Sequence, residues 1–149
     1  MPASLYDTSV WIAVVFTSHP LHKAARAVLL GATPAEPAVF CRSTQQSFLR
    51  LVSTAAVFRT YGMEVVTNRD ALAMLQDLLT LPQVCERDEP SGAAPLWRRL
   101  AACDTASPKV WMDAYLAAFA IRGCLQFVAL DRDFRAFELQ GLKLLLLEA

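Results

Sequence analysis

Short apolar runs, each about the length of a strand, are spread along the chain and separated by longer amphipathic stretches. SLYDT at 4–8 predicts a short buried strand, and CLQFVAL at 124–130 and LKLLLL at 142–147 predict two more. Strands that alternate with helices favour a parallel sheet with both faces covered. The pattern therefore predicts an α/β fold, in which helices flank a central, mainly parallel sheet on both faces.

The amphipathic stretches carry helix signals at their ends. Apolar residues spaced three and four apart predict helices over 21–30, 43–52 and 67–79, and a further helix over 109–123 is closed by a glycine. We expect Ser43 or Thr44 to cap the second of these helices. A capping box is predicted at the start of the third.

The length and composition of the chain narrow its class. With 149 residues and 55% hydrophobic content, the chain is predicted to form one domain, 1–149, with a buried core. Fourteen basic residues balance fourteen acidic ones, so nucleic-acid binding would depend on a local patch. Neither a secretory signal nor a membrane span is apparent, and the four cysteines show no C-x-x-C spacing. We expect a cytoplasmic protein with reduced thiols.

Three aspartates lie where a stable core would favour apolar residues. Asp7 and Asp131 each end a predicted strand, and Asp113 lies near the start of an otherwise apolar helix. If the two strands are neighbours, Asp7 and Asp131 emerge at the same edge of the sheet. An aspartate that follows a strand can also simply cap the next helix, and that alternative stays open for each one alone.

Three converging carboxylates repel one another unless a cation lies between them, and this favours a bound divalent metal. Oxygen ligands without nearby His or Cys favour Mg²⁺ or Mn²⁺ over zinc. A water bound to such a metal can attack a phosphodiester while the metal neutralises the developing charge. The aspartates therefore indicate metal-dependent hydrolysis of a nucleic-acid backbone.

Four sequence blocks together resemble a known family. They are YDTS at 6–9, FCRSTQQSFLRL at 40–51, SPKVWMDAYLAAFA at 107–120 and ALDRDF at 129–134. In this order they resemble a PIN domain, and in combination they resemble the VapC ribonuclease toxins of bacterial toxin-antitoxin pairs. The resemblance implies a PIN-like fold and a Mg²⁺-dependent endoribonuclease that hydrolyses RNA phosphodiester bonds.

The resemblance also implies roles for individual residues. The metal-binding acids of the family fall on Asp7, Asp113 and Asp131, with the first two as direct ligands and Asp131 acting through water. Ser9 would lie beside the metal or its water, and Asp133 would be an auxiliary acid at the edge of the site.

The chain departs from the family on the second helix, where a glutamate is usual. The nearest equivalent here is Gln45. A glutamine can still orient a water molecule, but it removes one negative charge from the site. The resemblance therefore implies weaker metal affinity, or one bound metal where relatives hold two.

Basic residues near these blocks suggest contacts with RNA. We expect Arg42, Lys109 and Arg132 to contact phosphates, although each could equally be a solvated surface charge. The toxin resemblance further implies a VapB-like antitoxin and a homodimer. Apolar residues at 21–30 and 48–52 are the candidate groove for an antitoxin segment.

Two other functions are compatible with parts of the sequence. An aspartate-nucleophile phosphatase also begins with an Asp at the end of its first strand, but it requires D-x-D and the second position here is Ser9. A PIN-fold protein that binds RNA or a partner without cleaving it would fit Gln45 and the neutral net charge.

Overall fold

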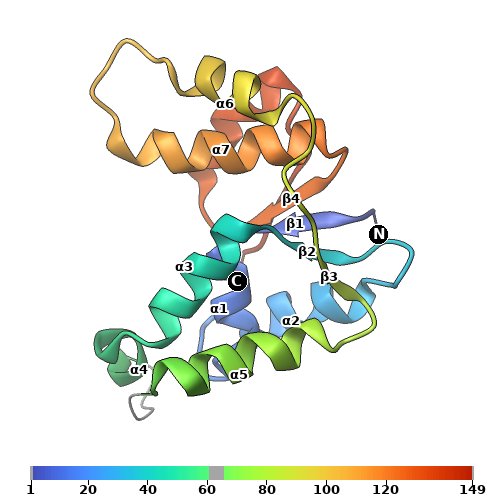
Figure 1. Ribbon diagram of the computed structural model, residues 1–149, viewed down its shortest axis with the longest axis vertical. Coiled ribbons are helices and arrows are strands. Elements are labelled where there is room, and N and C mark those ends of the chain that lie inside the picture. The colour runs from blue at the N-terminus through green and yellow to red at the C-terminus, as the bar shows by residue number, and fades with distance from the viewer. Residues whose placement is uncertain (1, 61–65, 149) are drawn as a thin grey trace.

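All described strands of the protein lie in one parallel sheet. The computed structural model describes residues 2–60 and 66–148 (Figure 1). Within this part of the chain, the strand order in the sheet is β3-β2-β1-β4-β5, and every neighbouring pair is parallel. The strands are β1 (Ser4–Tyr6), β2 (Ala38–Phe40), β3 (Val84–Glu86), β4 (Gln126–Ala129) and β5 (Leu144–Leu146).

Helices connect the strands and cover both faces of the sheet (Figure 1). They are α1 (Thr8–Val15), α2 (His22–Gly31), α3 (Arg42–Val52), α4 (Ala55–Thr60), α5 (Asn68–Leu79), α6 (Ala93–Ala101), α7 (Pro108–Arg122) and the 3₁₀ helix η1 (Arg132–Gln140). The predicted α/β class with a parallel sheet is confirmed.

Successive side chains of the strands alternate between two hydrophobic cores, one on each face of the sheet. Tyr6 and Phe40 face a core formed with α1, α2, α3 and α5, whereas Leu5, Val39 and Phe127 face a second core formed with α6, α7 and η1. Successive side chains of a strand point to opposite faces, so each central strand contributes to both cores. The sheet is therefore buried on both sides, and its carboxyl edge is where polar groups emerge.

Several elements differ from the sequence prediction, and two of them, β3 and α3, bear on the candidate site. β3 was not predicted, because its three residues change from buried Val84 to exposed Glu86 and show no apolar run. Helix α3 begins at Arg42, with Cys41 as its N-cap and Thr44 completing a capping box, so the predicted caps at Ser43 or Thr44 are wrong by two or three positions. The Thr44 hydroxyl accepts from the Cys41 backbone N–H at 3.0 Å, which explains why a cysteine can take the cap position.

The capping box predicted before α5 is confirmed. Thr67 accepts from the backbone N–H of Asp70, and the Asp70 carboxylate accepts from the backbone N–H of Thr67. Among the described residues, no helix is long and apolar enough to cross a membrane.

The core beneath β1 contains two polar atoms without a partner. Trp11 stacks on Phe40 with ring centroids 3.9 Å apart, and Tyr6 packs against Trp11 at 4.8 Å. The Tyr6 hydroxyl and the Trp11 indole N–H are buried and have no hydrogen-bond partner within the described part of the chain. Burial also raises the pKa of Tyr6 far above its ordinary value.

We predict that Tyr6→Phe raises the free energy of unfolding by about 1 kcal/mol, because it removes a buried hydroxyl that has no partner and keeps the ring packing. Urea unfolding followed by circular dichroism measures the change. Tyr115→Phe is the matched control: the Tyr115 hydroxyl donates to Glu89 at 2.8 Å, so its loss should not stabilise the protein. Equal destabilisation by the two substitutions would contradict the prediction.

Candidate functional site

The pairing of β1 with β4 brings two of the three aspartates to one edge of the sheet. Tyr6 is in register with Val128, and the Asp7 backbone N–H donates to the Val128 carbonyl at 2.9 Å. Asp131 follows β4 by two residues, at the same carboxyl edge. The predicted neighbourhood of Asp7 and Asp131 is therefore present in the structure.

Asp7 has a structural role as well as a place at this edge. It is the N-cap of α1, and its carboxylate accepts from the Thr8 backbone N–H at 2.8 Å and from the Ser9 hydroxyl at 3.2 Å. The capping alternative is thus confirmed for Asp7, and the same side chain lies at the carboxyl edge where the site was predicted. Ser9, predicted to lie beside the metal or its water, donates its hydroxyl to one carboxylate oxygen of Asp7.

Lys109 lies at the centre of the acidic cluster, which consists of Asp113, Asp131 and Asp133. Its ammonium is 2.6 Å from an Asp131 oxygen and 3.1 Å from oxygens of both Asp113 and Asp133. Lys109 and Asp113 are four residues apart on α7, so they share one face of the helix. The sequence prediction assigned Lys109 to RNA phosphates, whereas its contacts in the structure are with these acids.

Asp131 and Asp133 are arranged by the start of η1. Asp131 is the N-cap of η1, and its second carboxylate oxygen accepts from the Asp133 backbone N–H at 2.8 Å. The Asp133 side chain is mostly exposed, which fits its predicted place at the edge of the site.

The acids of the site differ in their electrostatics. Burial raises the pKa of the Asp7 carboxyl to about 6, the hydrogen bonds from Thr8 and Ser9 oppose the rise, and the charges of Asp113 and Asp131 add to it. Burial also raises the pKa of Asp113, against the attraction of Lys109. The hydrogen bond from Lys109, followed by that from the Asp133 backbone N–H, lowers the pKa of Asp131. Lys109 lies 2.6 Å from Asp131 and 3.1 Å from Asp113, and the Asp131 side chain is the more exposed of the two.

These residues fit a hard divalent cation by their chemistry. The donor atoms are carboxylate oxygens, and the pKa of Asp7 is raised mainly by burial, with a further contribution from the charges of Asp113 and Asp131. A cation, the Lys109 ammonium, already lies among Asp113, Asp131 and Asp133. Among the described residues, no three His, Cys, Asp or Glu side chains form a ready-made metal cluster. A metal would therefore have to compete with Lys109 for the same oxygens.

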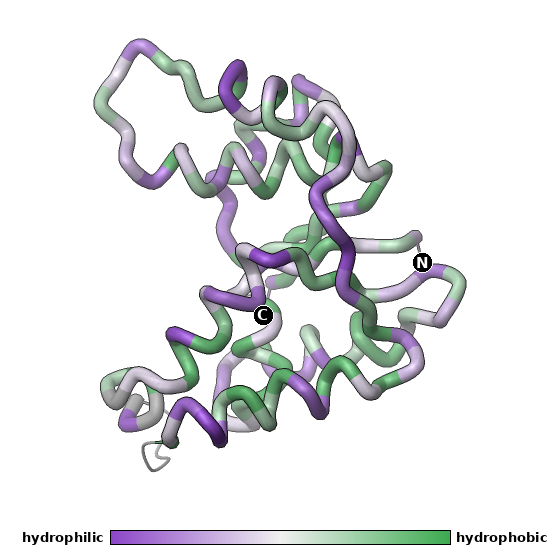
Figure 2. Tube along the Cα trace, viewed as in Figure 1, coloured by the Kyte–Doolittle hydropathy of each residue, from purple (hydrophilic) through white to green (hydrophobic). Residues whose placement is uncertain are grey.

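Gln45 and Arg42 lie outside this cluster. Both line a small pocket between the first turn of α3, the segment after β3 and α7. Figure 2 shows that the segment after β3 is strongly hydrophilic, and Figure 1 shows that it passes the N-terminal end of α3 on its way to α6. Sequence reasoning missed its residues 86–89 because β3 was not predicted; the run of charges ERDE was the available signal.

Arg132, the third predicted RNA contact, is on the surface. Its guanidinium lies 3.4 Å from Glu148 near the C-terminal end of the chain, and both side chains are exposed. Exposed pairs of this kind contribute little to stability and exchange readily with solvent. Arg132 is adjacent to Asp131, so its charge is near the acidic cluster.

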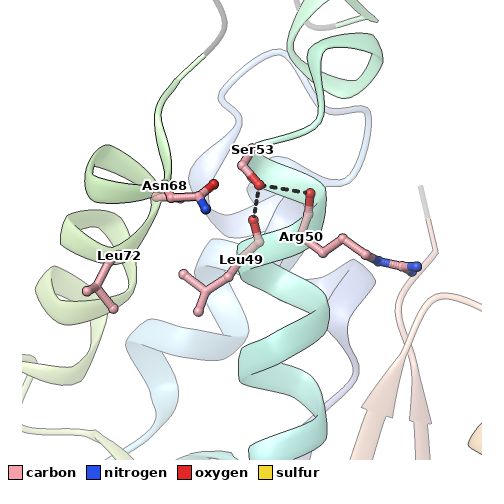
Figure 3. A pocket seen from close by; sticks show the side chains of 6 residues that line it. Leu49, Arg50, Ser53, Asn68 and Leu72 are labelled. Atoms are coloured by element: carbon pink, nitrogen blue, oxygen red, sulfur yellow. Dashed lines mark hydrogen bonds between the residues drawn. The ribbon is translucent and has the colours of Figure 1, made fainter.

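A larger hollow, of about 460 Å³, lies between α3 and α5 (Figure 3). Leu49 and Leu72 approach it from the two helices, and Asn68 extends from α5 toward Ser53, the C-cap of α3. The Ser53 hydroxyl donates to the Leu49 carbonyl at 2.7 Å, so it is bonded within its own helix. Of the two segments predicted to form a groove, 48–52 contributes to this hollow and 21–30 does not.

Comparisons with known proteins agree with this architecture. The PIN domain family model matches residues 5–139. Ribonuclease VapC41 of Mycobacterium tuberculosis, from strains CDC 1551 / Oshkosh and ATCC 25618 / H37Rv, is 40% identical over 134 residues, which cover 89% of this chain and 92% of that protein.

Two solved structures share the fold. VapBC2 from Rickettsia felis, bound to a DNA fragment from its promoter, superposes with a TM-score of 0.65 at 10% identity and covers 98% of this chain and 99% of its own. VapC20 of Mycobacterium tuberculosis, a sarcin-ricin loop cleaving toxin, superposes with a TM-score of 0.64 at 21% identity. The match covers 94% of this chain and 96% of the VapC20 chain. The resemblance identified from the sequence blocks is confirmed, and the chain belongs to the PIN-domain family as a relative of the VapC ribonucleases.

Proposed function

We propose that the protein is a metal-dependent endoribonuclease and the toxin of a VapBC-type toxin-antitoxin pair. The observation that carries the proposal is the position of Asp7, Asp113 and Asp131 at the carboxyl edge of the sheet, where β1 pairs with β4 and the Lys109 ammonium contacts Asp113 and Asp131. The 40% identity to ribonuclease VapC41 supports the choice of RNA as the substrate.

Each residue of the site has a task in this proposal. Asp7 and Asp113 would hold Mg²⁺ or Mn²⁺ directly, and Asp131 would act through a water molecule. When bound, the metal supplies an activated water and neutralises charge on the phosphoryl group. Ser9 fixes the orientation of the Asp7 carboxylate through its 3.2 Å hydrogen bond. Asp133, at the exposed edge, helps to place Lys109.

Lys109 stabilises the acids in the absence of metal. Without it, three carboxylates at the start of α7 and η1 would repel one another. With a metal held by these carboxylates, the exposed Lys109 ammonium would be available to an RNA phosphate, together with Arg42 and Arg132. This accounts for both its contacts in the structure and its predicted RNA role.

The partner in this proposal is a VapB-like antitoxin. The hollow between α3 and α5 presents Leu49 and the half-exposed Leu72, which an apolar side chain of an antitoxin segment would cover. Two observations support this part of the proposal: the chain shares its fold with a chain of the VapBC2 structure, and the lining of the hollow includes apolar side chains (Figure 3).

The proposal predicts that Asp113→Asn lowers RNA cleavage at least about 100-fold, because one metal-binding charge is lost. The measurement is cleavage of a structured RNA with Mg²⁺ or Mn²⁺, with EDTA as the metal-free reaction and circular dichroism as the check on folding. Asp104→Asn, on the exposed loop before α7, is the matched control and should leave cleavage unchanged.

Undiminished cleavage by the Asp113→Asn protein would refute the site assignment. RNA that binds to the wild-type protein but stays intact at every metal concentration would favour the binding-only function. Release of phosphate from a small ester, with a phosphoryl group trapped on Asp7, would favour a phosphatase.

The raised pKa of Asp7 predicts a pH-dependent stability of the metal-free protein. The folded state favours the protonated carboxyl, so stability should fall as the pH rises from the ordinary value of about 3.8 to about 6. That difference corresponds to roughly 3 kcal/mol. Unfolding in EDTA across this pH range measures the loss, which Asp7→Asn should reduce because asparagine keeps the cap without the charge. An identical pH profile in the two proteins would contradict the prediction.

Competition between Lys109 and the metal predicts an unusual substitution effect. Lys109→Met should lower the melting temperature in EDTA, because three acids lose their partner, and should lower the metal concentration needed for half-maximal thermal stabilisation. Titration of Mg²⁺ or Mn²⁺ in thermal unfolding measures both changes. Lys143→Met, at an exposed position, is the control. A metal affinity equal to or weaker than that of the wild type would show that Lys109 does not compete.

A further inference from the structure

The small pocket beside the acidic cluster has features that metal binding and hydrolysis do not explain. Its volume is about 70 Å³, and it lies over the carboxyl ends of β2 and β3, where the Arg87 backbone N–H donates to the Phe40 carbonyl at 2.9 Å. α3 contributes Arg42 and Gln45 to its lining, and α7 contributes Tyr115, two residues after Asp113. The pocket therefore lies at the same carboxyl edge of the sheet as the cluster, on the side of β2 and β3, while Asp113 and Tyr115 point to different faces of α7.

Gln45 is the feature that points to a ligand. Its side chain is only 8% exposed, yet within the described part of the chain its amide forms no hydrogen bond. Its amide is not one of the fully buried unpaired groups, which within the described residues are the Tyr6 hydroxyl and the Trp11 indole N–H, and Gln45 lines the pocket. A primary amide there offers two donors and an acceptor. A molecule that enters the pocket can satisfy these groups.

The charges in the lining limit what this molecule can be. Within the described residues, Arg42, Arg87, Glu86 and Asp88 are in no ion pair, and Glu89 accepts from the Tyr115 hydroxyl at 2.8 Å. Two guanidinium groups among three carboxylates disfavour a phosphate, which three negative side chains would repel. A neutral group that carries both donors and acceptors suits this mixed lining, and the edge of a nucleobase is such a group.

The size of the pocket sets how much of a ligand can enter. A volume of about 70 Å³ holds roughly two water molecules and is far below the 300 Å³ or more of a typical small-molecule site. It is too small for a nucleoside, but it can take the edge of one planar base that is not paired. RNA recognition of this kind usually takes place in loops and single strands, where base edges are free.

We propose that this pocket receives the edge of one unpaired RNA base, with the Gln45 amide as the selective contact. The inference rests on the proposed ribonuclease function, because the pocket would then fix the identity of a nucleotide close to the bond that is cleaved. In this arrangement Gln45 recognises one base of the RNA, and the aspartates take part in the hydrolysis.

The test compares the wild type with Gln45→Met, which keeps the length and burial of the side chain and removes its hydrogen-bonding groups. Each protein cleaves a pool of hairpin RNAs with randomised loops in Mg²⁺ or Mn²⁺, and the cleaved ends are sequenced. We expect a preference for one base at a fixed distance from the cleaved bond, which Gln45→Met weakens about tenfold while cleavage at other sequences continues. Gln46→Met, at the exposed neighbouring position, should keep the preference.

A second measurement separates this inference from the proposed function. The Asp113→Asn protein, with and without Gln45→Met, is titrated with short homopolymers of A, C, G and U, and binding is followed by fluorescence anisotropy. Discrimination among the homopolymers that depends on Gln45 supports the pocket even if no RNA is cleaved. A wild type without base preference, or a preference that survives Gln45→Met or is lost equally in Gln46→Met, would overturn the inference.

Discussion

The parallel pairing of β1 with β4 is the constraint on which the rest of the site depends. The bond from the Asp7 N–H to the Val128 carbonyl places the ends of two strands side by side, although more than a hundred residues separate them in sequence. Because both strands are buried on both faces, their side chains have no freedom to move the ends apart. The carboxylate of Asp7 must therefore lie near those of Asp113 and Asp131. Burial raises its pKa to about 6, and the charges of these two neighbours add to the rise.

Lys109 reduces the repulsion between the carboxylates that the fold brings together. One ammonium contacts three carboxylates from α7 and η1, and it is exposed enough to leave without disturbing either core. Asp7 receives no such contact and is held by neutral donors, Thr8 and Ser9. The site thus combines Asp7, whose charge burial disfavours and neutral donors hold, with three acids that each contact the Lys109 ammonium.

The aspartates were predictable because each contradicts its local pattern. Asp7, Asp113 and Asp131 interrupt apolar runs, and parallel topology then brings the strand ends together. Lys109 was predictable as a residue near the site but not as the centre of the cluster, because the position of its ammonium depends on how η1 packs against α7. The environment of Gln45 depends on β3, whose three residues lack a hydrophobic period and are ordered by pairing with β2. Contacts of that kind are set by tertiary structure, which local sequence patterns do not encode.

The capping role of Asp7 and Asp131 has a consequence for how this protein can change over generations. A single transition in an aspartate codon produces asparagine, which caps a helix about as well. The catalytic activity can then be lost while the fold and the surface of the protein are retained. Lineages under pressure to silence such an enzyme therefore have a short mutational route to an inert copy that is still recognised by whatever binds the original.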